Sequence, residues 1–154
     1  MRAVIRLTIL SALGLALALG PGLAPPAVAA GDAAPSPGAQ RAMAEIRAVI
    51  TAQIAAFRAG DVEAAFAHAS PQIRERFVTA RNFGAMVRQG YPMVEKSVEQ
   101  IFGALTPEGG RLRQAVLLKG PEGRLWAADY WLIPVAEGGW RIDGVRIDRK
   151  AQGI

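Results

Sequence analysis

Beyond residue 39, apolar side chains first recur at the spacing of an α-helix. Turned by 100° per residue, residues 40–59 place their large apolar side chains in one stripe: Met43, Ile46, Val49, Ile50, Ile54 and Phe57. Gly60 is typical of a helix C-terminus, and Asp61 is a good cap for a following helix. Gln53 is the exception, because its amide falls in the middle of the stripe. The pattern predicts one long helix packed against a core.

Shorter helical patterns follow over residues 62–69, 71–78 and about 79–90. Ser70 and Pro71 are a strong helix start, since serine caps the free N–H groups and proline fits the first helical position. The last of these helices is expected to end at Gly90. The pair Tyr91-Pro92 then predicts an extended exit from the helices, because proline restricts the residue before it.

In the second half, apolar and polar positions alternate between clusters of glycine and proline. Strands are predicted within residues 95–105 and over 111–119, 124–135 and 140–148, with turns at 106–110, 121–123 and 137–139. Helices followed by strands that are joined by short turns predict an α+β fold. We expect N-terminal helices packed on a curved four-stranded antiparallel meander sheet.

The strand predicted over 124–135 carries bulky apolar groups on both faces. Leu125, Trp131 and Ile133 share one face, whereas Trp126 and Leu132 share the other. A strand of this kind is covered on both sides. One face is expected to pack on the helices, and the other to meet a curled sheet edge, a partner protein or a second copy of the chain in a homodimer.

The first thirty residues have the pattern of a secretory signal peptide. Arg2 and Arg6 give a basic start, residues 7–19 form a short apolar run, and small residues allow cleavage after Ala29 or Ala30. An uncleaved membrane anchor is the alternative, but the apolar run is too short for a comfortable span. We therefore expect an exported protein, periplasmic or secreted after cleavage, without a stable membrane span.

This reading divides the chain into three parts. Residues 1–30 are the signal peptide, residues 31–39 form a flexible linker rich in proline, alanine and glycine, and residues 40–150 form a single α+β domain.

Composition excludes several classes of chemistry. The chain has no cysteine, which removes disulfides, thiol catalysis, Fe–S clusters and thiolate zinc sites. His68 is its single histidine, and one histidine alone does not make a metal site. Removal of Arg2 and Arg6 lowers the formal charge from +5 to +3, and no dense basic run is present. We expect neither a metal nor another cofactor, and no nucleic-acid partner.

The order of the predicted elements, with Gly60-Asp61 between the first two helices, resembles the nuclear-transport-factor-2-like superfamily, which includes ketosteroid isomerase and scytalone dehydratase. More narrowly, the chain is similar to an uncharacterised family of exported alphaproteobacterial proteins, through residues 46–50, 52–53, 56–58, 69–71, 83, 86–92, 120–121, 123–124 and 140–142. The chain departs from that family at Met93, where members often carry a second proline. The resemblance implies a cone-shaped fold and export, and it implies no activity.

Enzymes of that superfold place an acid or base at the mouth of an apolar cone. Of the polar candidates, which are Gln53, Gln114, Asp129, Tyr130 and Asp143, the sharpest is Asp129. A carboxylate buried beside Trp131 would have a raised pKa and could act as a general base. Tyr130 lies on the opposite face of the strand and is not expected to join Asp129 in one site. The plainer alternative is that Asp129 pairs across the sheet with Arg113 or Arg141.

Two hypotheses follow from these candidates. The preferred one is a non-catalytic module that binds a small apolar ligand or an envelope partner, with Gln53, Gln114, Asp129 and Trp131 as candidate ligand-binding residues. The alternative is a small isomerase or dehydratase with Asp129 as general base, which requires Asp129 to line a cavity open to solvent. Gln53 itself is either a satisfied core amide or the polar wall of such a pocket.

Overall fold

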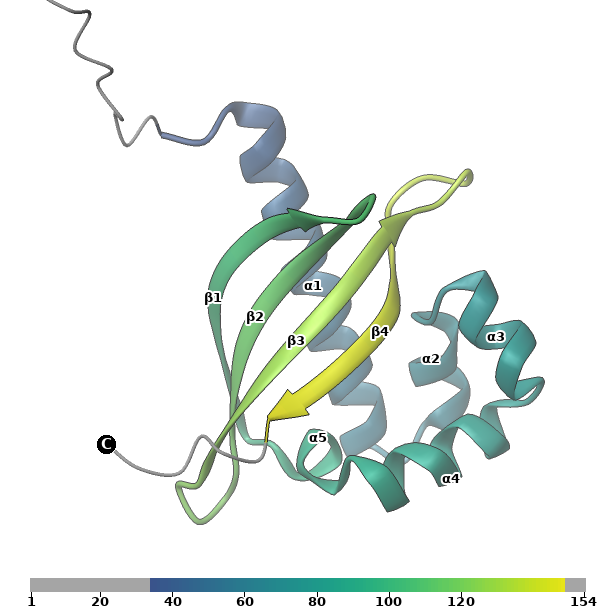
Figure 1. Cartoon of the computed structure of the whole chain (residues 1–154). Coiled ribbons are helices and arrows are strands. Elements are labelled where there is room, and N and C mark those ends of the chain that lie inside the picture. Colours follow the sequence, from purple (N-terminus) through teal and green to yellow (C-terminus); the bar gives the residue numbers. More distant parts are fainter. Residues whose placement is uncertain (1–33, 149–154) are drawn as a thin grey trace, which may run out of the picture. The chain divides into compact units, whose positions relative to one another are not determined.

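Along residues 34–148, which the computed structural model describes, five helices precede a four-stranded sheet (Figure 1). The helices are α1 (Pro37–Arg58), α2 (Val62–Ala67), α3 (Pro71–Phe77), α4 (Ala80–Gly90) and α5 (Pro92–Lys96), and the strands are β1 (Glu99–Glu108), β2 (Arg111–Lys119), β3 (Leu125–Pro134) and β4 (Trp140–Asp148). The strands pair antiparallel in the order β1-β2-β3-β4. The predicted α+β class with an antiparallel meander is therefore confirmed. The predicted signal peptide lies outside the described residues.

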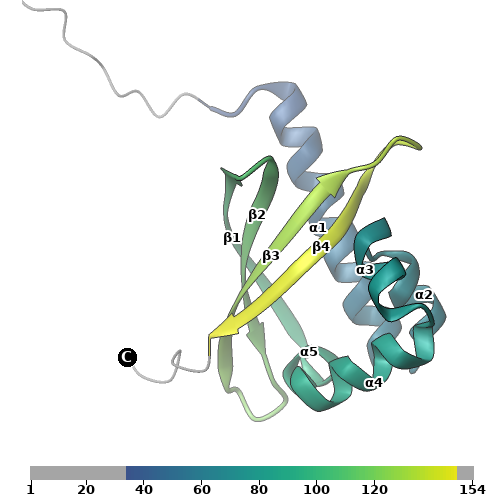
Figure 2. The ribbon, with the colours of Figure 1, turned by 45° about the vertical axis from the view of Figure 1, so that its right-hand side comes forward.

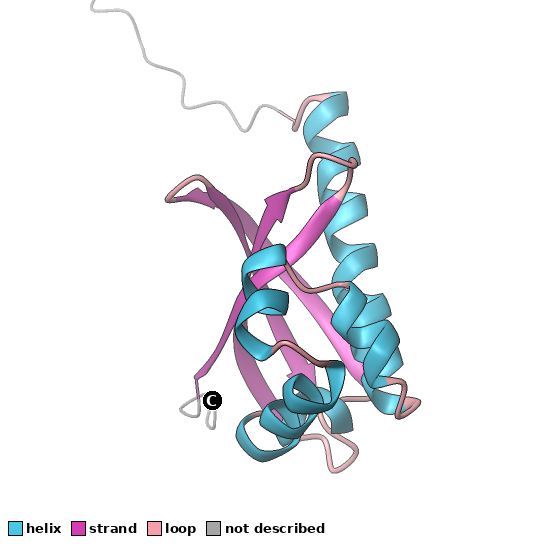
Figure 3. Cartoon of the chain, turned by 90° about the vertical axis from the view of Figure 1, so that its right-hand side faces the viewer, coloured by secondary structure: helices cyan, strands magenta, loops and turns pink. Residues whose placement is uncertain are grey.

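Helix α1 is long because one face is apolar along most of its length. Ile46, Ile50, Ile54 and Phe57 are all buried, and Figure 3 shows the helix running along one side of the sheet. The helix begins at Pro37 rather than at the expected residue 40, because the Ser36 hydroxyl accepts a hydrogen bond from the first turn. Its first turn thus occupies residues that we expected to belong to the linker.

Helices α2, α3 and α4 begin at capping side chains. Asp61, Ser70 and Thr79 each accept a backbone N–H from the residue three positions further on. The expected extended exit after Tyr91 is wrong, because Pro92 opens the short helix α5 instead. Proline is accepted at the first position of a helix, so α4 ends at Gly90, Tyr91 is non-helical, and a new helix starts at Pro92.

The sheet departs from the predicted boundaries at its first strand. Because α5 occupies residues 92–96, β1 starts at Glu99 and extends through Pro107 to Glu108. Proline is tolerated there because β1 is an edge strand. The predicted five-residue turn is reduced to Gly109-Gly110, both with positive φ.

The two faces of the sheet differ in what covers them. All five helices lie on one side, and the other side is left open (Figures 1 and 2). The covered inner face contributes Val116, Leu118, Ala128, Tyr130, Leu132 and Ile142 to the core. On the uncovered outer face, Ile101 is 45% exposed, Leu117 36% and Leu125 37%. Within the described residues nothing therefore covers the second apolar face of β3.

No helix among residues 34–148 is long and apolar enough to cross a membrane.

Candidate functional site

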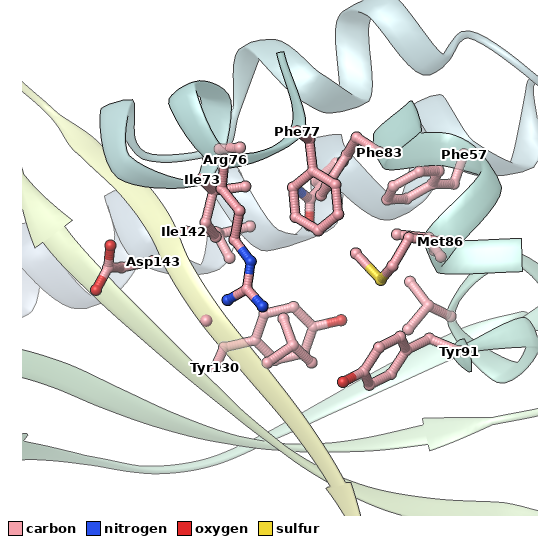
Figure 4. A pocket seen from close by; sticks show the side chains of 16 residues that line it. Phe57, Ile73, Arg76, Phe77, Phe83, Met86, Tyr91, Tyr130, Ile142 and Asp143 are labelled. Atoms are coloured by element: carbon pink, nitrogen blue, oxygen red, sulfur yellow. The ribbon is translucent and has the colours of Figure 1, made fainter. Parts of the chain in front are cut away.

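A cavity of about 300 Å³ opens between the inner face of the sheet and the helices (Figure 4). Most of its lining is apolar, from α1, α3, α4, β3 and β4. The lining residues are Gln53, Phe57, Ala69, Ile73, Arg76, Phe77, Phe83, Met86, Val87, Tyr91, Val94, Tyr130, Ile142, Asp143, Gly144 and Val145. Its volume equals that of about ten molecules of liquid water, and it lies at the lower end of the range for ligand pockets.

Tyr130 provides the deepest polar group of the cavity wall. The residue is fully buried, and its hydroxyl has no hydrogen-bond partner. In Figure 4 this hydroxyl points toward Met86 and Tyr91, which also line the cavity. Burial raises the pKa of Tyr130 above its ordinary value, so the hydroxyl stays protonated. The cavity therefore contains a hydrogen-bond donor that the described protein groups leave unused.

Partly exposed apolar side chains form the mouth of the cavity, together with the charged side chain of Arg76. Phe77 and Met86 are partly exposed there, while Arg76 is exposed. The Arg76 guanidinium lies about 6.0 Å from the ring of Phe77 and extends over the cavity toward Tyr130 (Figure 4). Along residues 34–148, no acidic side chain forms an ion pair with Arg76.

The rim contains a strained backbone position immediately after these residues. Val78 ends α3 with φ 64° and is 76% exposed. Positive φ is costly for a β-branched residue, and no other non-glycine residue of the described chain adopts it. The strained residue directly follows Phe77, which lines the cavity, and does not line the cavity itself.

Gln53 combines the two roles that the sequence left open. It is 3% exposed, and its amide nitrogen donates to the Ala65 carbonyl at 3.2 Å. The same side chain lines the cavity. Gln53 is thus a hydrogen-bonded core amide that also forms part of a cavity wall.

Gln114 supports the sheet and does not line the cavity. Its fully buried amide nitrogen donates to the carbonyls of Gly103, Ala104 and Ala115 at 2.9, 3.3 and 2.9 Å. Gly103 and Ala104 lie where the pairing of β1 with β2 shifts register. Such an irregularity leaves backbone carbonyls without ladder partners, and the amide supplies donors for them.

Asp129 points away from the cavity, on the outer face of the sheet. Arg113 donates to one carboxylate oxygen at 2.8 Å and Arg146 to the other at 2.7 Å. Burial alone would raise the pKa of Asp129, but these two hydrogen bonds and charges outweigh it and hold the pKa below its ordinary value. The expected pairing with Arg113 is present, whereas Arg146 occupies the place considered for Arg141. A general base would need a free carboxylate, and this one is engaged on both oxygens.

Trp131 lies on the same outer face, two residues further along β3. Its ring is flanked by the guanidinium groups of Arg111 and Arg146, at 5.5 and 5.2 Å. Its indole N–H donates to Glu108 at 3.0 Å. Trp131 therefore belongs to the charged network around Asp129 and does not contribute to the cavity.

Asp143 lies at the edge of the cavity with its carboxylate turned outward (Figure 4). One oxygen accepts the Ser70 hydroxyl at 2.8 Å, and the other lies 3.4 Å from Arg111. The residue falls where the pairing of β3 with β4 shifts register. Asp143 thus ties the start of α3 to β4 and adds no free negative charge to the cavity.

The described residues hold no group of three or more His, Cys, Asp and Glu side chains that could bind a metal ion. Of the four candidate ligand-binding residues, the structure places only Gln53 at the cavity. Tyr130 was one of the polar candidates, and it was set aside because it faces away from Asp129. The signal was the alternation of β3, which puts Tyr130 on the face that packs against the helices.

Comparisons with known proteins place the chain in one family. No curated protein and no solved structure matches it. A family model described as a domain of unknown function, DUF4864, matches residues 39–153, which include all of the cavity-lining residues. The chain belongs to the DUF4864 family.

Proposed function

We propose that this domain binds a small, mostly apolar molecule in the cavity between its sheet and its helices. The observation that carries the proposal is the Tyr130 hydroxyl, which is fully buried, unpartnered and directed into a cavity with apolar walls. A buried polar group without a partner costs about 1–3 kcal/mol. A ligand with one hydrogen-bond acceptor would remove that cost while filling the cavity.

The distribution of burial supports this role. The floor is formed by buried side chains such as Phe57, Phe83 and Ile142, whereas the mouth is formed by the partly exposed Phe77 and Met86. An apolar floor with an unbranched methionine side chain at the entrance suits ligands of varied shape.

Binding can be tested with 1-octanol as a neutral probe of suitable size, followed by backbone amide NMR of the purified protein. We expect shift changes at Tyr130, Ile142 and Val145, and none at Leu117 on the outer face. Val145→Trp fills the cavity and should abolish these changes while circular dichroism remains that of the wild type. Unchanged spectra, or changes confined to the outer face, would contradict the proposal.

A catalytic role through Asp129 receives less support. That hypothesis required Asp129 to line a cavity open to solvent, and its carboxylate instead accepts from Arg113 and Arg146 on the outer face. We therefore propose binding in preference to isomerase or dehydratase chemistry.

We also propose export of the protein. The support is the signal-peptide pattern of residues 1–30. N-terminal sequencing of the protein from the periplasmic or secreted fraction should give a chain that begins at Ala30 or Gly31. A chain that retains Met1 in that fraction would contradict cleavage.

Homodimerisation through the outer face is a further proposal. Ile101, Leu117 and Leu125 are exposed on that face, where the small, partly buried Ala115 and Ala127 also lie, and a second copy would cover them. Light scattering at micromolar concentration should give the mass of a dimer, and Leu117→Glu should give a monomer. A wild-type monomer would refute the proposal.

Finally, we infer kinship with the nuclear-transport-factor-2-like superfamily. The support is the element order, with a long first helix and short helices before an antiparallel meander. An experimental structure that superposes poorly on that superfamily would contradict it.

A further inference from the structure

The cavity differs from an ordinary apolar pocket in the charges around its mouth. Residues 71–90, which form α3 and α4 on one side of the cavity, contain four arginines and one glutamate: Arg74, Arg76, Arg81, Arg88 and Glu75. Such an excess of positive charge raises the local concentration of anions. Only Arg76 of this group lines the cavity.

The polar groups that reach the cavity offer donors and lack a free negative charge. Arg76 has no ion-pair partner among the described residues, and Tyr130 has an unused hydroxyl. The carboxylate of Asp143, the acid in the lining, is bound by Ser70 and Arg111 and turned away. A ligand that complements this set must present acceptors and a negative charge.

Arg76 and Tyr130 also approach the same part of the cavity from opposite sides. Arg76 comes from α3, and Tyr130 comes from β3 beneath it (Figure 4). Beyond them, the aromatic rings of Phe57 and Phe83 and the Met86 side chain enclose apolar space. A carboxylate is an acceptor-only group that can take hydrogen bonds from a guanidinium and a hydroxyl together.

We propose that the natural ligand is an apolar monocarboxylate, whose carboxylate binds between Arg76 and Tyr130 while its hydrocarbon or aromatic body fills the cavity. The inference rests on the proposed binding function and narrows the ligand to one chemical class. An aliphatic acid and an aromatic acid share this chemistry, and the probes below distinguish them.

The test compares octanoate with 1-octanol, which has the same chain length and no charge, by titration followed with amide NMR at pH 7. Wild type should bind octanoate at least about tenfold more tightly than 1-octanol. Arg76→Gln should abolish this preference and leave the affinity for 1-octanol unchanged, while Arg76→Lys should retain part of it. 4-Phenylbutyrate tests the aromatic alternative under the same conditions.

Two further variants make the test specific. Arg88→Gln removes an exposed arginine of α4 that does not line the cavity, and should leave the preference intact. Tyr130→Phe should weaken octanoate binding by about tenfold to a hundredfold, as expected for loss of one hydrogen bond to a charged group.

The two proposals fail differently. Equal affinities for octanoate and 1-octanol, or an octanoate preference that survives Arg76→Gln, would overturn the carboxylate assignment while leaving ligand binding in place. Absence of binding by 1-octanol and by both acids would overturn ligand binding itself.

Discussion

Asp129 and Tyr130 are neighbours on β3, yet they face opposite sides of the sheet and meet opposite environments. On the outer face, Asp129 has both carboxylate oxygens bound by arginines. On the inner face, Tyr130 is fully buried with a hydroxyl that no described protein group binds. A polar group that is already satisfied stabilises the fold, whereas an unsatisfied one beside a cavity is available to a ligand. Gln114 Oε1 and Arg47 Nε are also buried without a partner among the described residues, but neither residue lines the cavity, so it is an unpartnered polar group together with a cavity that marks the candidate site.

The largest expected difference between the faces concerns stability. Leu132→Ala removes a fully buried side chain from the inner face and should lower the free energy of unfolding by about 3 kcal/mol. Leu117→Ala on the outer face removes a partly exposed one and should cost less than about 1 kcal/mol. Urea denaturation of both variants at low protein concentration measures the difference. Equal losses would show that something covers the outer face.

Substitution of Tyr130 by phenylalanine is expected to raise the free energy of unfolding, whereas the two leucine substitutions lower it. Tyr130→Phe removes the unpartnered hydroxyl and keeps the ring, so the ligand-free protein should become more stable by about 1 kcal/mol. Thermal unfolding after extensive delipidation measures this effect. Destabilisation would mean that the hydroxyl already has a partner in the free protein, and the contrast with Asp129 would then disappear.

Substitution of Asp129 should instead lower the free energy of unfolding, by an amount that depends on pH. Its folded-state pKa is lowered, so its ion pairs contribute fully above the unfolded-state pKa of about 4 and are lost as pH falls through the lower folded-state value. Asp129→Asn should therefore destabilise the protein by up to about 1 kcal/mol at pH 7, and by progressively less below pH 4.

Urea titrations of wild type and Asp129→Asn between pH 2.5 and 7 measure this dependence. Added salt should shrink the difference at pH 7, because exposed charges are screened. A difference that grows on acidification would contradict the ion-pair account.

The smallest effect is expected at the rim of the cavity. The hairpin turns of the sheet place glycine at positive φ, for example Gly109 and Gly123, whereas the rim places Val78 there. Val78→Gly should relieve strain but add entropy to the unfolded chain, for a net stabilisation of about 0.5 kcal/mol. Gly109→Ala is the matched control at a turn and should destabilise. Loss of stability in Val78→Gly would show that its backbone is unstrained.

Side-chain periodicity predicted much of the fold. The stripe of α1, the capping residues Asp61 and Ser70, and the glycine-rich turns are local signals, and they located most helices and strands within a few residues. The register shifts in β1 and β4 depend on pairing between strands, which periodicity does not encode. Residues 92–96 were misread because Tyr91-Pro92 is compatible with both an extended exit and a helix start.

The sequence predicted less of the candidate site than of the fold. The sequence shows that Asp129 lies among apolar residues. It does not show that Arg146 of β4 lies directly opposite Asp129, or that Arg113 of β2 is its diagonal neighbour on the same face. It likewise gives no sign that Arg76 reaches over Tyr130, because these residues meet only when α3 packs beside the sheet. Whether a polar side chain has a hydrogen-bond partner is decided by the assembled fold.

The most direct test of this account is native mass spectrometry of the protein purified from the exported fraction of its own host, beside two variants. We predict that wild type and Asp129→Asn retain a small apolar acid and that Val145→Trp, whose cavity is filled, is free of it. An adduct lost from Asp129→Asn and retained by Val145→Trp would place binding on the outer face and contradict the account.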